Sequence, residues 1–327
     1  MAPQAPSTPT GSDRSASTPG STPSRTTPGG TVVKTSHWDP GNAAYKTLMD
    51  KKKADAKEQR RKRMSGLLDR LRKNESVVEN VAWWSLTTDE CAQIFTLGSR
   101  CTPLTTLYCD GNGLGSRPSG ISVLLLSPQI QLTELTMTEN NLGPEALKAI
   151  ANALRTNQTL LLLDVKNNQI SDNGTNYEGL KTLSDCLDAQ GGKPGINYNI
   201  TLSSLDLSGN CLYDYGVNTL QTVIQHNTVL SELHLANNGM TQEAGKFLLE
   251  CLKTGSENGS ILYSMQLLGN DIHLRELSKI QKILDKSAGL RRNWESKVQS
   301  RFVKGNMKGK PKSIREKNGT LSSPERK

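Results

Sequence analysis

The sequence has few of the residues from which common functional sites are built. Aromatic residues make up 4% of its 327 residues, which disfavours a surface that stacks nucleic-acid bases. No apolar run approaches the ~18 residues of a membrane-spanning helix, and the N-terminus lacks the apolar stretch of a secretory signal. The six cysteines show no CxxC spacing and are too few for a disulfide framework. We therefore expect buried free thiols, a reducing compartment and no metal site.

Motifs that carry catalytic chemistry are missing as well. The chain has no GxxxxGK[ST] loop and no GxGxxG that follows a strand, so it lacks a phosphate-binding signature. It has four histidines, and no Ser or Cys of triad type is placed beside them by motif. The sequence predicts no catalytic residue, no cofactor and no small-molecule substrate.

Positive and negative charges are segregated along the chain. The net charge of +9 divides into +1 for residues 1–45, +8 for 46–73, −9 for 74–290 and +9 for 291–327. An acidic body is therefore flanked by two basic arms. Nucleic-acid binding by the folded surface would need positive charge on that surface, which the body does not offer.

Both ends of the chain have compositions typical of disorder. Residues 1–42 are rich in Ser, Thr, Pro and Gly, and residues 304–327 are basic and rich in Gly and Lys. Four N-terminal threonines precede a proline and are candidates for proline-directed phosphorylation. They are Thr8, Thr18, Thr22 and Thr27.

Residues 43–75 predict a basic helical arm, because they are strong helix formers with many positive charges. The densest basic block consists of Arg60, Arg61, Lys62 and Arg63. The apolar residues form a short strip of Met64, Leu67, Leu68 and Leu71. Three interpretations stay open: a solvated helix, a contact for an acidic partner (a tubulin tail, nucleic acid or a phospholipid surface), and a nuclear-import signal.

A repeated pattern fills the body of the chain. Six segments fit LxxLxLxxNxL and begin at residues 104, 132, 160, 202, 230 and 262. The steps between them are 28, 28, 42, 28 and 32 residues, so 28 is the unit and two connections carry insertions. The LxL core predicts a short strand with one buried face, and the apolar spacing within 145–154 and 242–252 predicts a helix after it. Neither element can bury its apolar side alone, so successive units must stack.

One asparagine per unit lies where the chain turns away from the strand, and its amide can bond backbone groups left unpaired there. These structural asparagines are Asn112, Asn140, Asn168, Asn210, Asn238 and Asn270.

A glycine follows most of these asparagines, and NxTL precedes two of the strands, at 157–160 and 199–202. With the 28-residue strand–helix unit, these features make residues 76–290 resemble the ribonuclease-inhibitor-type leucine-rich repeat family. The resemblance implies an α/β fold: a right-handed solenoid horseshoe with a parallel sheet on its concave side and helices outside. It also implies interaction rather than catalysis, since members include ribonuclease inhibitor, the Ran GTPase-activating protein, tropomodulin, nucleotide-binding immune receptors and axonemal proteins.

A solenoid needs covered ends. Residues 76–103 predict a degenerate N-terminal cap repeat, residues 104–272 hold the six repeats, and residues 273–303 predict a C-terminal capping helix. Thr87 or Thr88 is the expected N-cap of a helix in the first of these, and Trp83 and Trp84 are expected to cover the edge of its strand. The stripe of the C-terminal helix comprises Leu274, Leu277, Ile280, Ile283, Leu284, Leu290, Trp294, Val298 and Phe302.

Alternate strand residues are expected on the concave face, where neighbouring strands lie ~4.8 Å apart. The candidate partner-binding residues are Tyr108, Asp110, Glu134, Thr136, Asp164, Lys166, Asp206, Glu232, His234 and Gln266. Five of them are acidic, and Lys166 is the only fixed positive charge. The face is either an ordinary solvated surface or an acidic groove for a basic protein segment. The chain's own tethered basic arms are a further candidate occupant.

The sequence as a whole predicts a non-enzymatic, intracellular leucine-rich-repeat scaffold or adaptor. Its protein partner would offer a basic segment to the concave face, and its basic arms would contact an acidic partner such as a tubulin tail in a cytoskeletal or axonemal assembly. Two alternatives stay open. One is a Ran-type GTPase activator, for which Arg117 is the candidate loop arginine, and the other is a nucleic-acid-associated protein that binds through its arms. The expected location is the cytoplasm, with cytoskeletal association or the nucleus open.

Overall fold

The computed structural model describes residues 43–116, 120–188 and 198–304, with backbone only for 43–44 and 293–304. It divides into two units, residues 1–57 and 58–327. Of the first unit, only the beginning of helix α1 (Ala43–Arg72) is described. The sheet, its covering helices and all the surfaces discussed below lie in the second unit.

Seven short parallel strands form one sheet whose spatial order equals the chain order. The strands are β1 (Val78–Asn80), β2 (Thr106–Tyr108), β3 (Glu134–Thr136), β4 (Leu162–Asp164), β5 (Ser204–Asp206), β6 (Glu232–His234) and β7 (Ser264–Gln266). Equivalent residues pair throughout, and Leu162 pairs with Ser204 across the 42-residue step as Glu134 pairs with Leu162 across a 28-residue step. The insertion therefore does not disturb the register.

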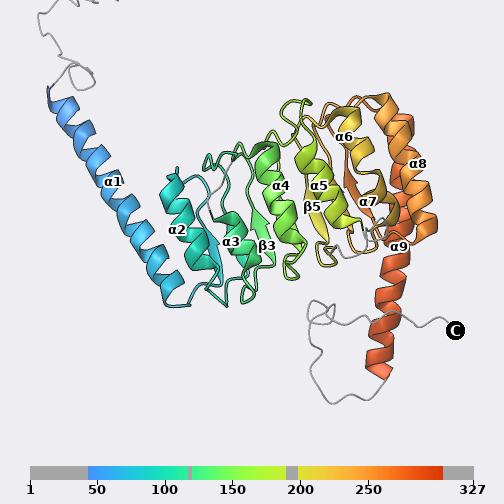
Figure 1. Cartoon of the computed structure of the whole chain (residues 1–327), viewed down its shortest axis with the longest axis horizontal. Coiled ribbons are helices and arrows are strands. Elements are labelled where there is room, and N and C mark those ends of the chain that lie inside the picture. Colours follow the sequence, from blue (N-terminus) through green and yellow to red (C-terminus); the bar gives the residue numbers. More distant parts are fainter. Residues whose placement is uncertain (1–42, 117–119, 189–197, 305–327) are drawn as a thin grey trace, which may run out of the picture. The chain divides into compact units, whose positions relative to one another are not determined.

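Helices cover one side of this sheet and follow one another in chain order from α2 to α8 (Figure 1). They are α2 (Thr88–Gly98), α3 (Ile121–Leu126), α4 (Gly143–Leu154), α5 (Glu178–Leu187), α6 (Tyr213–Thr219), α7 (Gln221–His226), α8 (Gln242–Asn258) and α9 (Leu274–Lys304). The predicted α/β fold of stacked leucine-rich units, with a parallel sheet and outer helices, is confirmed.

The core lies between the sheet and the helices. The central residue of each strand from β2 to β7 points into it, and Leu135, Leu163, Leu205 and Leu233 are completely buried. The facing helices bury the residues that their spacing predicts, for example Leu147, Ile150 and Leu154 of α4. Burying one such side chain contributes ~1.5–3 kcal/mol, and only stacked units can bury both sides of this layer.

The six structural asparagines form a ladder along the edge where the strands end. The backbone N–H of each asparagine from Asn112 to Asn238 donates to the side-chain oxygen of the next one, at 2.8–2.9 Å. Each side-chain amide donates back to a carbonyl of the preceding unit, as Asn168 does to Met137 (2.8 Å), and all but Asn238 also donate to a carbonyl of their own unit. All are buried except Asn270, which ends the ladder and is half-buried.

A second asparagine series lies at the opposite ends of the strands. Asn157, Asn199 and Asn227 are buried and donate to the carbonyls of Leu125, Leu154 and Leu187 respectively, at 2.6–2.9 Å. Their side-chain oxygens accept backbone N–H groups two and three residues later. The NxTL pattern, and the related NTVL at 227–230, is therefore an asparagine-centred turn that precedes β4, β5 and β6.

The C-terminal half of α1 covers the first strand, which corrects the interpretation of this segment as a solvated helix. Its strip of Met64, Leu67, Leu68 and Leu71 is buried in the common core. Strand β1 carries Glu79 at the position that is leucine in β2 to β6, and this glutamate is buried. Arg70 donates to both of its carboxylate oxygens, at 2.9 and 2.7 Å, and Ser76 donates at 2.6 Å. Residues from 58 on therefore belong to the repeat-bearing unit and not to a separate arm.

Of the two expected N-cap residues of α2, Thr87 is the one, and it forms a capping box with Glu90, the third residue of the helix. Trp83, expected to cover the strand edge, instead lies over the backbone of Gly111, where an added Cβ would overlap its ring, and is 64% exposed. At the other end, Ile280 and Leu284 of α9 are buried, but Leu274 and Leu290 are exposed, so the predicted stripe is wrong at these two positions. The side chains of Trp294, Val298 and Phe302 lie outside the described residues.

Candidate functional site

The side of the sheet away from the helices, which we call the open face, carries two rows of strand residues. The first row runs Thr106, Glu134, Leu162, Ser204, Glu232 and Ser264. The second runs Tyr108, Thr136, Asp164, Asp206, His234 and Gln266. Asp110 and Lys166 follow two residues after their strands. The ten candidate residues therefore share one face, as strand alternation requires.

Most of these side chains are half-buried, because neighbouring rows cover one another. Thr136 is buried and donates to Asp110 (2.9 Å), so it positions a carboxylate and does not itself offer a free contact. Tyr108 donates to Glu134 (3.2 Å), and Gln266 is exposed. The candidate side chains are thus less exposed to solvent than those of an ordinary solvated surface.

Neutral donors hold the carboxylates in place without removing their charge. Asp110 also accepts the backbone N–H of Thr138 (2.7 Å), and Asp164 accepts that of Lys166 (2.9 Å). Glu232 accepts from Ser204 (3.0 Å) and from the hydroxyl of Tyr263 (2.7 Å). Tyr263, which no sequence pattern indicated, lies just before β7, and the guanidinium of Arg291 lies 4.8 Å from the centre of its ring.

Asp164 and Asp206 are neighbours in the second row, and their electrostatic states differ. Burial raises the pKa of Asp164, and the charges of Asp206 and Asp110 add to this effect. Burial would also raise the pKa of Asp206, but hydrogen bonds from His234 and Ser208 outweigh it, and the net shift is downward. The 3.4 Å contact with Asp206 raises the pKa of His234. The centre of the face therefore holds two neighbouring carboxylates, of which Asp206 has an imidazole partner.

The four residues of the basic block differ in the contacts that they make. Arg60 donates to both carboxylate oxygens of Glu90, at 2.9 and 2.6 Å, so it links α1 to α2, and its role as a partner contact stays a prediction. Arg61 and Lys62 are exposed and lie 3.6 and 3.8 Å from Glu58. Arg63 is exposed as well.

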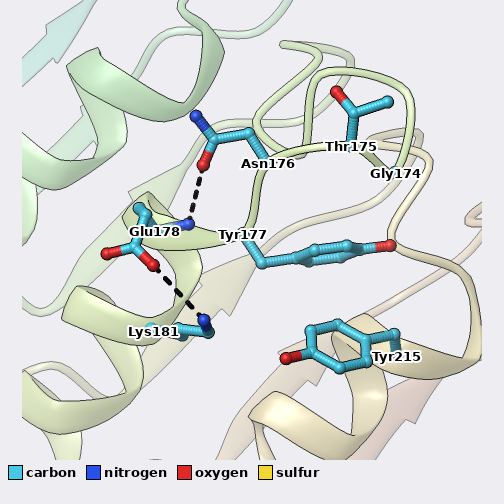
Figure 2. Close-up of a pocket in the computed structure, with 7 residues that line it drawn as sticks. All are labelled: Gly174, Thr175, Asn176, Tyr177, Glu178, Lys181 and Tyr215. Carbon is cyan, nitrogen blue, oxygen red and sulfur yellow. Dashed lines mark hydrogen bonds and ion pairs between the residues drawn. The ribbon is translucent and has the colours of Figure 1, made fainter.

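A shallow pocket opens at the rim where the chain leaves β4 and β5 for the following helices (Figure 2). It is lined by Gly174, Thr175, Asn176, Tyr177, Glu178, Lys181 and Tyr215. The rings of Tyr177 and Tyr215 lie 4.7 Å apart at 56°, and Lys181 contacts Glu178 at 3.3 Å. The sequence analysis did not identify this pocket.

Within 43–116, 120–188 and 198–304, no three His, Cys, Asp or Glu side chains are grouped to hold a metal ion. No helix in the same ranges is long and apolar enough to cross a membrane. All six cysteines are free, five are buried, and burial raises the pKa of Cys91 and of Cys186 to about 11. Arg117, the four Thr-Pro sites and residues 305–327 lie outside the described residues.

Comparison with known proteins identifies the repeat. A family model described as "Leucine Rich repeat" matches residues 131–151, 156–174, 198–220 and 226–249. NACHT, LRR and PYD domains-containing protein 3 of Rattus norvegicus is 30% identical over 185 residues, which are 56% of this chain and 16% of that protein. Protein 14 of the same series from Mus musculus is 28% identical over 242 residues, which are 68% of this chain and 24% of that protein. The chain thus spans less than a quarter of the length of these curated relatives.

Among solved structures, the chain is similar to "Leiomodin-1 Actin-Binding Site 2 (ABS2)", with a TM-score of 0.30 and 12% identity over 72% of this chain and 95% of that one. The likeness is too distant to transfer a function. The sequence relatives establish leucine-rich repeats, and the ribonuclease-inhibitor type within them stays a prediction.

Proposed function

Since the chain carries leucine-rich repeats, an architecture typical of protein interaction, we propose that it is a non-enzymatic scaffold whose open face binds a basic segment of a protein partner. The observation that carries the proposal is the register of the sheet. It places Asp164 beside Asp206 in one row, with Glu134 and Glu232 in the other, and Lys166 is the only fixed cation among the candidate residues.

The electrostatics favour a cationic ligand over an empty face. Two unit charges about 5 Å apart repel by roughly 3 kcal/mol at an effective dielectric constant near 20. An arginine or lysine placed between Asp164 and Asp206 would relieve that repulsion and lower the pKa of Asp164. Neutral donors already fix the carboxylates, so little ordering is needed on binding.

A matched pair of double variants of the full chain tests the proposal. Asp164→Lys/Asp206→Lys reverses charge on the open face, while Asp185→Lys/Glu250→Lys makes the same change at exposed positions of α5 and α8. The probe is a short peptide of alternating arginine and glycine, measured by calorimetry. We expect the first pair to weaken binding at least tenfold and the second to weaken it far less. Equal weakening by both would show that net charge, and not the face, attracts the peptide.

We propose that the basic arm contacts an acidic partner through Arg61, Lys62 and Arg63, without Arg60. A truncation that tests the arm must end before residue 58, because removing residues 1–75 would also remove the buried strip of α1. Removal of residues 1–57 keeps Arg61, Lys62 and Arg63, so we expect it to retain binding to an acidic peptide, whereas Arg61→Ala/Lys62→Ala/Arg63→Ala should weaken that binding. Loss of binding on the truncation, with binding retained by the triple variant, would contradict the proposal. A cytoskeletal or axonemal role, a GTPase-activating role and the cellular location stay predictions.

A further inference from the structure

Among the tyrosines at the rim, Tyr215 has no evident role in holding the fold. The ring of Tyr213 fills the space over Gly174 and Gly239, where an added Cβ would overlap it, and Tyr177 donates its hydroxyl to the carbonyl of Leu212 (2.9 Å). Tyr215 packs on Tyr177 and leaves 53% of its surface exposed beside the pocket. Tyrosine is enriched among the residues that dominate binding energy at protein interfaces, because its ring is apolar and its hydroxyl can bond.

The surroundings of this ring favour positive charge. Residues 171–181 and 211–216 contain Asp172, Glu178 and Asp214 but only one cation, Lys181. Glu178 accepts from Lys181 and raises its pKa, and Tyr215 raises it further. A cation therefore already lies beside Glu178 and Tyr215, held by an exposed ion pair that contributes little to stability and that an incoming group can displace.

We infer that this pocket binds the guanidinium of an arginine in the basic segment that the open face recognises, an inference that rests on the proposed function. A planar guanidinium can stack on the Tyr215 ring while its N–H groups donate to Glu178. The same two units supply both surfaces, because β4 leads from Asp164 to the 174–178 loop and β5 leads from Asp206 to Tyr215. The pocket is thus built by the segments that directly follow Asp164 and Asp206 in the chain, and a segment bound across these carboxylates that continues in the direction of β4 and β5 would approach it.

The first test compares two peptides on the full chain: alternating arginine and glycine, and its lysine counterpart of equal length and charge. We expect Tyr215→Leu, which keeps apolar bulk but removes the ring, to weaken the arginine peptide about tenfold and the lysine peptide distinctly less. Tyr215→Phe keeps the ring and should retain the affinity. Unchanged melting temperatures establish that the variants remain folded.

The second test uses two lysines in similar ion pairs. Lys181 pairs with Glu178 at 3.3 Å and Lys246 pairs with Glu243 at 2.7 Å, both three residues apart on exposed helix surfaces. Each lysine-to-alanine variant changes the net charge equally. Lys181→Ala frees the pocket and should strengthen the arginine peptide several-fold, whereas Lys246→Ala should change it little. Equal effects of the two variants would overturn the assignment of the pocket.

The outcomes separate this inference from the proposed function. If Tyr215→Leu has no effect while Asp164→Lys/Asp206→Lys weakens the arginine peptide, the pocket inference is wrong and the open face stands. If only Tyr215→Leu weakens it, the pocket binds arginine but the open face is not its partner surface. If neither peptide binds the unaltered chain, both are overturned.

Discussion

Replacing Asn168 by alanine removes four hydrogen bonds at the centre of the asparagine ladder. Its amide donates to Met137 (2.8 Å) and Lys166 (3.0 Å), and its oxygen accepts from the backbone of Asn140 (2.9 Å) and Leu142 (3.3 Å). Three of these backbone groups have no other partner among the hydrogen bonds described, since only the Lys166 carbonyl also accepts from Glu139. Because Asn168 is completely buried, water cannot replace what is lost.

The expected loss of stability follows from the number of backbone groups left without a hydrogen-bond partner. Each unsatisfied buried group costs ~1–3 kcal/mol, and partial relaxation reduces the sum, so we expect Asn168→Ala to lower the free energy of unfolding by about 3–5 kcal/mol. Asn270 makes the equivalent four bonds, to Leu235, Leu267, Asn238 and Met240, but is only half-buried. Water can take its place, and we expect Asn270→Ala to cost about 1–2 kcal/mol.

Urea unfolding followed by circular dichroism measures both variants, with the slope of the transition monitored because a weakened solenoid can unfold in parts. Asn152→Ala, at an exposed position of α4, is the control for the exchange itself and should be neutral or slightly stabilising. A loss for Asn168→Ala that is no larger than the loss for Asn270→Ala would refute the reasoning, because the two differ in burial and not in bonding.

Further predictions concern the N-terminal cap and the charged face. Leu67→Ala should lower the free energy of unfolding by about 2–5 kcal/mol if the second half of α1 is part of the core, and urea unfolding checks this. Arg70→Leu leaves the buried Glu79 unpaired and should cost about 3–5 kcal/mol, whereas the double variant with Glu79→Leu should recover most of the loss; a double variant no better than the single one would contradict the role assigned to the pair. His234 has a raised pKa, so its contact with Asp206 stabilises the folded state fully below the ordinary histidine pKa of about 6.5 and loses that contribution as the pH rises through the folded value. The stability of the unaltered chain should therefore fall relative to that of His234→Gln between about pH 6 and pH 8, and parallel profiles would argue against the pair.

The repeats could be predicted from the sequence because each unit has the same local pattern. The central leucine, the asparagine and the following apolar helix recur at fixed spacing, and strand alternation then decides which residues reach the open face. The first unit was harder to predict from the sequence, because Glu79 stands at the central position of β1 instead of a leucine. Its partner is Arg70, which comes from helix α1. A four-residue apolar strip among many charges resembles a solvated helix until the end of the sheet that it covers is known.

The sequence predicted which residues reach the open face, but not how exposed each of their side chains is. Side-chain bonds between neighbouring units, such as Thr136 to Asp110, decide what is exposed, and alternation within one strand does not reveal them. The rim pocket is formed by loops from two units, and one feature of the sequence could have indicated it. Tyr177 and Tyr215 each stand just before a helical glycine, Gly179 and Gly216, in adjacent repeats.

The undisturbed register across the 42-residue step also has a practical use. The backbone N–H of Asn199 donates to the carbonyl of Cys186 at 2.9 Å, so a bond between described residues joins the two ends of that connection. Foreign cargo such as an epitope or a fluorescent reporter, spliced between Asp188 and Tyr198, should leave the strand pairing intact on both sides. This connection is thus an internal site at which the chain can be labelled, more than 120 residues from either end of the sequence.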